Sequence, residues 1–323
     1  MIEKQLLWTP PPEGSAVRLG ILEKRAASSD GRFPPVLLVH GATLGHRLFD
    51  LPRPGYSLMD ELVRAERAVY AIDIRGYGTS LGSAVMEAPS ALNPPYAGTD
   101  VAVEDIGAAV DFISKRRGVA VVDLIGFSWG TITAARYAGT HPNKIARLAL
   151  YAPLYREENI AWLERIADSS DLRRLAPTYG AYRLITLFDL VSRWDDELPT
   201  RDSNLFREEG IPELVFEALA SLDPLSTSRD PPAFRCPNGA LADMVTIFNG
   251  EPLYQAEKIT MPTLLLRGAE DATSTQSDAC RLLADIASPL KDYRVISPGS
   301  HFLCIERNRA KLYEQLVEFL KPI

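Results

Sequence analysis

The chain has 323 residues, of which 35 are Lys or Arg and 42 are Asp or Glu, so its formal net charge at pH 7 is −7. This length suits one large α/β domain, or one domain that carries a sizeable insertion, and it allows a substantial core. The negative charge and the lack of a basic cluster argue against nucleic acid or an anionic membrane as the partner.

The first half of the chain alternates strand-like and helix-like segments. The N-terminal part, up to about Leu22, predicts a short strand or hairpin that leads into a polar turn at residues 28–32. Asp100 is expected to cap a long amphipathic helix that ends at Gly118. Strands are predicted at residues 34–41, 68–73, 120–125 and 145–151, and helices at residues 57–67, 101–116 and 131–140.

The alternation of strand-like and helix-like segments stops after Pro153. Residues 154–257 have a helical periodicity that prolines interrupt, and no apolar strand-like run stands out among them. Alternation then resumes, with strands at 263–268 and 292–296 and helices at 275–286 and 308–320. Such alternation indicates the α/β class, with a mostly parallel sheet that helices cover on both faces. We therefore expect a core of residues 1–153 and 258–323. Residues 154–257 would form a helical lid over the carboxyl ends of the strands, where such sheets bind ligands.

A serine lies at the break between the strand at 120–125 and the helix that follows it. Residues 126–130 read GFSWG, which fits the G-x-S-x-G pattern of a nucleophile on a sharp strand-to-helix turn. Bulky residues two positions either side of Ser128 would clash in such a turn, so glycine is expected at both. The amides at the start of the next helix favour developing negative charge. Ser128 is therefore the predicted nucleophile.

A serine hydroxyl needs a base, and the chain has four histidines. His301 is the best candidate, because it lies in a loop between the last predicted strand and the last helix and can reach the edge of the sheet. His40 ends a strand and is expected to hold the shape of the loop around the site. His46 lies in a loop and His141 lies at a helix end, where a capping or surface role is expected.

The base in turn needs a carboxylate that fixes its tautomer and stabilises the imidazolium. Asp271 lies in the loop RGAEDATS after the strand at 263–268, and its neighbour Glu270 is the fallback. The resulting order of Ser128, Asp271 and His301 is the chain order of α/β-hydrolase triads. His301 and Cys304 alone do not make a metal site, so no metal is expected.

Two backbone amides are expected to bind the developing oxyanion. The amide of Trp129, next to the nucleophile, would supply one, and the amide of Ala42, after the strand that ends at His40, the other. Thr43, beside Ala42, and Tyr155, just past the end of a strand, are candidate substrate contacts. Every basic residue between positions 154 and 257 is an arginine. One of these arginines could bind a substrate carboxylate, or all of them could stay solvated while the aromatic residues pack the lid.

Five motifs occur in one order along nearly the whole chain: HGATLG, DIRGYGTS, GFSWG, GAED and GSH. In this combination the chain resembles the α/β-hydrolase superfamily. The resemblance implies a sheet of about eight strands, a lidded pocket, no cofactor and acyl transfer through a covalent serine ester. It assigns Ser128 as nucleophile, His301 as base and Asp271 as the orienting acid. It also implies that Asp73 and Arg75, in DIRGYGTS, brace the fold.

The expected activity is hydrolysis of a carboxylic ester of a small to medium organic substrate. An amide, a thioester or a carbon–carbon bond next to a carbonyl could react at the same residues. The S-W-G step also resembles proline iminopeptidases, although HGATLG replaces their H-G-G-P-G. Relatives with an aspartate nucleophile are excluded by Ser128. The sequence is also compatible with an acyltransferase, or with a ligand-binding or receptor protein whose triad is slow.

The sequence also suggests where the protein acts. Three cysteines far apart argue against a disulfide framework and favour a reducing compartment, so a cytoplasmic location is expected. We see no secretory signal at the start and no apolar run near the ~20 residues that span a bilayer, so no membrane partner is expected. The expected partner is a small acyl substrate, and the sequence leaves open whether the chain forms a homo-oligomer.

Overall fold

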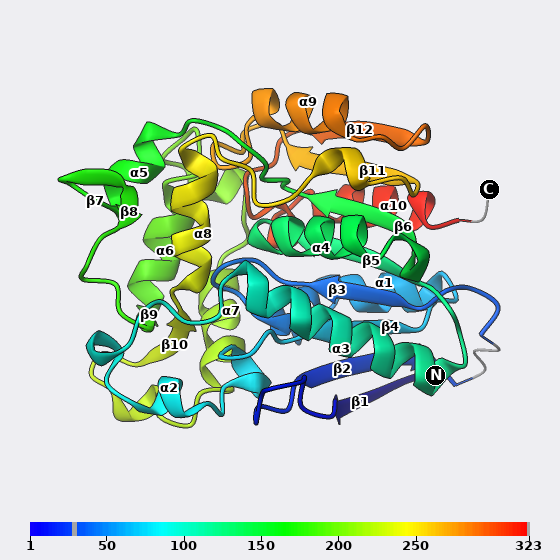
Figure 1. Cartoon of the computed structure of the whole chain (residues 1–323), viewed down its shortest axis with the longest axis horizontal. Helices are drawn as coiled ribbons and strands as arrows, with labels where there is room; N and C mark the ends of the chain where they lie inside the picture. The colour runs from blue at the N-terminus through cyan, green and yellow to red at the C-terminus, as the bar shows by residue number, and fades with distance from the viewer. Residues whose placement is uncertain (28–30, 322–323) are drawn as a thin grey trace.

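A computed structural model describes residues 1–27 and 31–321 of the chain. Part of the polar turn predicted at residues 28–32 lies outside the described residues. One eight-stranded sheet runs through the molecule (Figure 1). Its spatial order is β1 (Ile2–Trp8), β2 (Gly20–Ala26), β4 (Val69–Ile72), β3 (Val36–Val39), β5 (Val122–Phe127), β6 (Ile145–Tyr151), β11 (Thr263–Gly268) and β12 (Lys291–Ile296).

The sheet is mostly parallel, as the alternation of the sequence predicts. β1 pairs antiparallel with β2, and β2 antiparallel with β4, whereas every other neighbouring pair is parallel. Every residue of β3, β4, β5 and β11 is buried, because helices cover both faces of the sheet. The α/β fold class is confirmed.

Among the described residues, six α-helices lie outside the segment 154–257. α3 and α4 cover one face of the sheet, while α1 and α10 lie behind it (Figure 1). α9 packs against β12 at the edge of the sheet. The bounds are α1 (Leu58–Arg64), α2 (Ala84–Glu87), α3 (Thr99–Arg117), α4 (Trp129–Thr140), α9 (Gln276–Asp285) and α10 (Arg309–Phe319).

The ends of the long helix α3 differ in how well the sequence predicts them. Gly118 ends α3 as expected and takes the left-handed conformation, with φ 66°, which glycine adopts easily. The prediction for the other end is wrong: α3 begins at Thr99 after Gly98, which makes no side-chain cap, and Asp100 lies inside the first turn. There its carboxylate still interacts favourably with the positive end of the helix dipole.

Residues 154–257 form an insertion between β6 and β11, at the carboxyl ends of the strands (Figure 1). The expectation of a purely helical insertion is wrong, because the insertion also contains two small antiparallel sheets. The strands escape detection from the sequence because they are short and carry charged or proline residues instead of an apolar run. The elements are α5 (Ile160–Ile166), β7 (Ala167–Asp168), β8 (Asp171–Leu175), β9 (Tyr182–Thr186), α6 (Leu187–Asp195), α7 (Ile211–Ala220), β10 (Ala233–Pro237) and α8 (Gly239–Phe248).

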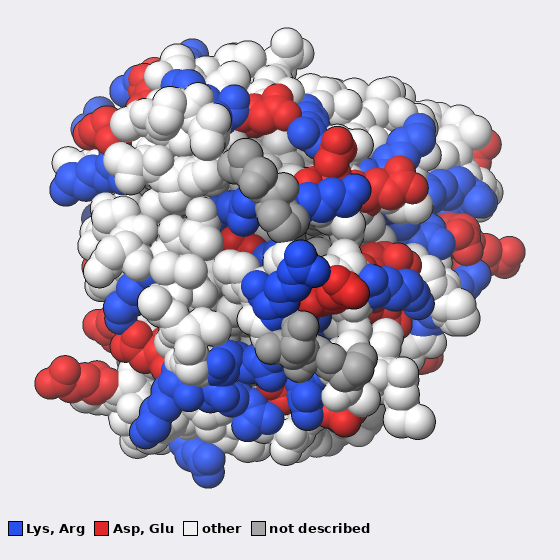
Figure 2. Space-filling view, turned by 90° about the vertical axis from the view of Figure 1, so that its right-hand side faces the viewer, with Lys and Arg blue, Asp and Glu red and all other residues white. Residues whose placement is uncertain are grey.

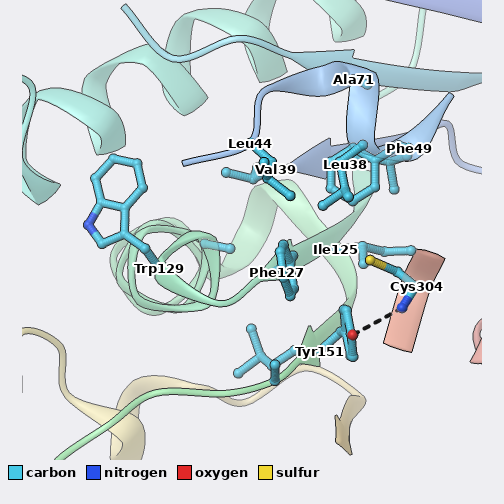
Figure 3. Close-up of a cluster of buried hydrophobic side chains, with 14 of the residues drawn as sticks. Leu38, Val39, Leu44, Phe49, Ala71, Ile125, Phe127, Trp129, Tyr151 and Cys304 are labelled. Atoms are coloured by element: carbon cyan, nitrogen blue, oxygen red, sulfur yellow. Dashed lines mark hydrogen bonds between the residues drawn. The ribbon is translucent and has the colours of Figure 1, made fainter. Parts of the chain in front are cut away.

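The core beneath the end of β5 combines aromatic and aliphatic side chains (Figure 3). The rings of Phe127 and Tyr151 stack with their centroids 4.9 Å apart, which joins β5 to β6. The Tyr151 hydroxyl donates to the carbonyl of His301 at 2.9 Å and accepts from the amide of Cys304 at 3.1 Å. Tyr151 therefore supports the loop that carries His301 and, through Phe127, also the turn that carries Ser128.

The face at the opposite end of the sheet from the insertion is charged but mixed. Figure 2 shows basic and acidic side chains interspersed over the described part of this face.

Candidate active site

Ser128 occupies a strained turn between β5 and α4. Its backbone has φ 54° and ψ −122°, which side-chain-bearing residues rarely adopt. A Cβ at Gly130 would lie 2.6 Å from the carbonyl oxygen of Val39, and one at Gly126 would collide with the carbonyl oxygen of Gly130. Both glycines are therefore sterically required, and the turn presents the Ser128 side chain at the end of the sheet.

His301 lies between Ser128 and Asp271. Its Nε2 is 2.8 Å from the Ser128 Oγ, and its Nδ1 is 2.9 Å from Oδ2 and 3.0 Å from Oδ1 of Asp271. The amides of Thr273 and Ser274 donate to the same Oδ1 at 2.9 and 2.7 Å. Because a carboxylate only accepts hydrogen bonds, Nδ1 carries the proton and Nε2 is free to accept the serine proton.

His40 fixes the loop that begins at the end of β3. Its Nε2 accepts from the amide of Ile74 at 3.1 Å, so its Nδ1 carries the proton and donates to the carbonyl of Gly41 at 2.8 Å. Burial lowers the pKa of His40, in keeping with a neutral ring. The Gly41 carbonyl belongs to the same peptide unit as the amide of Ala42, so His40 orients that amide.

A cavity of about 370 Å³ opens above Ser128, between the core and the insertion. The core supplies Ser128, His301 and the loop at Gly41 to Leu44, and the insertion supplies most of the apolar walls. The apolar side chains around it are Leu44, Phe127, Trp162, Ile166, Tyr179, Leu184, Ile185, Leu190, Leu241, Met244 and Phe302. This size and lining suit a small to medium organic ligand.

A family model described as the alpha/beta hydrolase fold matches residues 34–308. The chain belongs to the α/β-hydrolase fold family. A thermophilic esterase from Thermogutta terrifontis has the same fold, with a TM-score of 0.66 and 19% identity over 98% of each chain. A hydrolase from Pseudomonas aeruginosa PA01 gives a TM-score of 0.65 at 18% identity over 99% of each chain.

One curated relative matches at the level of sequence. It is the uncharacterized protein YnbC of Escherichia coli (strain K12), which is 26% identical over 270 residues. The match covers 82% of this chain but only 40% of YnbC, so the chain spans less than half the length of that relative.

Four of the residues singled out in the sequence of this α/β hydrolase line the cavity. Ala42 and Thr43 line it together with Ser128 and His301. Glu270, the fallback acid, instead accepts from the Gly299 amide at 2.7 Å. The acid that faces the histidine is therefore Asp271, one position further on.

Trp129 joins the turn to the insertion. It is the first residue of α4, directly after Ser128, and its indole Nε1 donates to Oδ2 of Asp243 on α8 at 2.8 Å. The hydroxyl of Thr99 donates to the same oxygen at 2.8 Å. Burial raises the pKa of Asp243 to about 6 despite these bonds.

The expectation that Tyr155 contacts substrate is wrong, because this residue does not line the cavity. Its hydroxyl donates to Asp285 at 3.0 Å, its amide donates to Asp278 at 2.8 Å, and its ring packs 5.2 Å from that of Tyr254. The chain leaves β6 across α9 rather than over Ser128, and the Tyr155 side chain follows it.

His46 is not a surface residue either. It is buried, and its Nδ1 and amide donate to Asp73 at 2.6 and 2.8 Å. Asp73 also accepts from the amide and hydroxyl of Thr79. Burial alone would raise the pKa of the Asp73 carboxyl, but His46 helps to hold this pKa well below its usual range. Arg75 forms an ion pair with Asp105 at 2.6 Å. These contacts brace the loop behind the cavity.

A carboxylate that no local sequence pattern marks supports the loop that carries Asp271. Glu197, just after α6, is buried and accepts from the Ala272 amide at 3.1 Å and from the Thr273 hydroxyl. Arg193 pairs with Glu197 at 2.5 Å and donates to the Thr273 hydroxyl at 2.9 Å. Burial works to raise the pKa of Glu197, but the charge of Arg193 and the hydrogen bond from the Thr273 hydroxyl help to hold it below its ordinary value. The insertion thus fixes the loop that carries Asp271.

Two features are absent from the described part of the chain. It contains no cluster of His, Cys, Asp and Glu that could hold a metal ion. None of its helices combines the length and apolar character needed to cross a bilayer.

Proposed function

We propose that this α/β hydrolase cleaves a carboxylic ester, or a related acyl bond, of a small to medium organic substrate through an acyl-enzyme on Ser128. The observation that carries the proposal is the chain of contacts from Asp271 through His301 to Ser128, at the floor of an apolar cavity. The similarity in fold to an esterase supports the same class of reaction. The insertion, residues 154–257, would serve as a lid that excludes water and selects the substrate.

The mechanism has two half-reactions. The Ser128 oxygen attacks the acyl carbon while its proton moves to Nε2 of His301, and the amides of Ala42 and Trp129 would bind the oxyanion. The carbon–oxygen bond to the alcohol then breaks, and the alcohol takes the proton from Nε2. Water attacks the acyl-enzyme, gives its proton to Nε2 and releases the acid, after which the proton returns to the Ser128 oxygen. Asp271 holds the imidazolium in both halves.

A panel of chromogenic esters with an aminoacyl anilide alongside tests this proposal. Turnover of an ester by the wild type, abolished in Ser128→Ala and retained in Ser170→Ala on an exposed turn, is expected. A fluorophosphonate probe should add its mass to Ser128 and not to the Ser128→Ala protein. Preference for the anilide would point to a peptidase, and tight ligand binding without any turnover or adduct would contradict the hydrolase.

A further inference from the structure

Arg183 on β9 is a half-buried cation that lines the cavity. One terminal nitrogen donates to the Pro237 carbonyl at 2.9 Å and to Oδ1 of Asn238 at 3.1 Å. The other donates to the Ala42 carbonyl at 3.1 Å and to the Thr43 hydroxyl at 3.0 Å. All four acceptors are uncharged, and within residues 1–27 and 31–321 the Nε–H has no acceptor.

The charge of Arg183 is therefore not balanced by any contact within residues 1–27 and 31–321. Among the described residues no carboxylate pairs with it, whereas Arg193, the other arginine of the cavity, pairs with Glu197. Asp189 also lines the cavity, but it is exposed and caps α6 by accepting from Thr186. A cation that is partly withdrawn from water without a counter-ion is unfavourable, and an anionic ligand removes that penalty.

Thr43 adds a second donor beside Arg183. Its hydroxyl accepts from Arg183, and in the part of the chain that the structure describes no acceptor takes the hydroxyl proton. Thr43 follows Ala42, whose amide is the proposed oxyanion donor. A group bound by Thr43 and Arg183 would thus lie only a few bonds from the reacting carbonyl.

We propose that the cavity takes acyl substrates that carry a carboxylate a few bonds from the scissile carbonyl, and that Arg183 and Thr43 bind this carboxylate. Monoesters of short dicarboxylic acids have this chemistry. The inference rests on the proposed function, because it names the substrate class of the same site. A guanidinium–carboxylate contact is among the stronger hydrogen-bonded pairs and discriminates against a neutral amide of the same shape.

Binding to the Ser128→Ala protein tests this inference without turnover. Calorimetry would compare monomethyl glutarate with its neutral isostere, the methyl ester of glutaramic acid. We expect the anionic ester to bind about 10- to 100-fold more tightly, as for a hydrogen bond to a charged group. Arg183→Gln should remove this preference, and Arg183→Lys, which keeps the charge, should retain part of it. Arg165→Gln, which removes the same charge from an exposed ion pair with Asp196, is the matched control and should leave the preference unchanged.

Two results would overturn the inference. One is equal affinity for the two esters in the protein that retains Arg183. The other is an Arg183→Gln variant that weakens binding of both esters equally, which would mean that Arg183 only holds the loop at Ala42. Neither result affects the proposed hydrolase, because neutral esters and the fluorophosphonate probe report on Ser128 independently.

Discussion

Replacing Glu197 by glutamine tests whether the insertion supports the loop that carries Asp271. The substitution keeps the shape of the side chain but removes the charge that pairs with Arg193 at 2.5 Å. It also weakens the acceptor for the Ala272 amide and the Thr273 hydroxyl. We therefore expect a less stable protein and a less rigid acid loop.

The burial of the ion pair sets the size of the effect. Arg193 holds the pKa of Glu197 below its ordinary value although burial works to raise it, and breaking a buried ion pair costs about 3 to 5 kcal/mol. Arg193 stays a quarter exposed, so solvent screens part of this interaction, and a loss of about 2 to 3 kcal/mol is expected for Glu197→Gln. Since the pKa is lower in the folded protein, the stabilisation is complete above about pH 4.5 and is lost as the pH falls through the lowered pKa.

Urea denaturation of the wild type and of Glu197→Gln, followed by tryptophan fluorescence at several pH values, measures this difference. The difference in the free energy of unfolding between the wild type and Glu197→Gln should be largest at pH 7. It should decrease as the pH is lowered from 5 to 3. Glu164→Gln, on α5 of the same insertion, removes one exposed carboxylate and is the matched control. A Glu197→Gln protein within about 0.5 kcal/mol of the wild type at pH 7, the usual range for surface changes, would refute the reasoning. So would a difference that does not change with pH.

Three other substitutions give distinct outcomes. Asp271→Asn should lower kcat for an ester by about 10³- to 10⁴-fold, because the amide no longer stabilises the imidazolium of His301; unchanged kcat would contradict its role. Gly130→Ala should lower the free energy of unfolding by about 1 to 3 kcal/mol and so reduce Tm, because its Cβ would lie 2.6 Å from the Val39 carbonyl oxygen. Burial raises the pKa of Asp243 to about 6 in the folded protein, so its ionised form opposes folding above that pH, and this penalty fades as the pH falls towards 3.8. Asp243→Asn should accordingly unfold at a higher urea concentration than the wild type at pH 8 and at a similar one near pH 4. A variant less stable than the wild type at pH 8 would contradict the inference that ionised Asp243 opposes folding.

The elements that local sequence patterns define were predicted closely. The strands predicted at 145–151 and 263–268 have the bounds observed for β6 and β11. The glycines at 126 and 130 mark the turn at Ser128 because their neighbours leave no room for a side chain. Each of these features depends on residues close together in the chain, so the pattern alone carries the information.

The parts that were missed depend on contacts between distant segments. Nothing near Glu197 marks it, and its importance comes from the Ala272 amide, which is 75 positions away along the chain. Arg183 is one of many arginines in the insertion, and only its position on β9 beside Thr43 distinguishes it. The place of Tyr155 just after a strand predicts a substrate contact, but the path of the chain over α9 directs its side chain away from the cavity.

The amino-acid sequence therefore determined the order of strands and helices outside residues 154–257, the glycine-bounded turn at Ser128, and the residues proposed as base and acid. The tertiary structure decided which side chains of the insertion face the cavity and what holds the loop of Asp271. It also decided which arginine of the cavity has no carboxylate partner among the residues that the structure describes. The reason is that periodicity and turn sterics act over a few residues. The walls and charge balance of a cavity are set by how separate segments pack against one another.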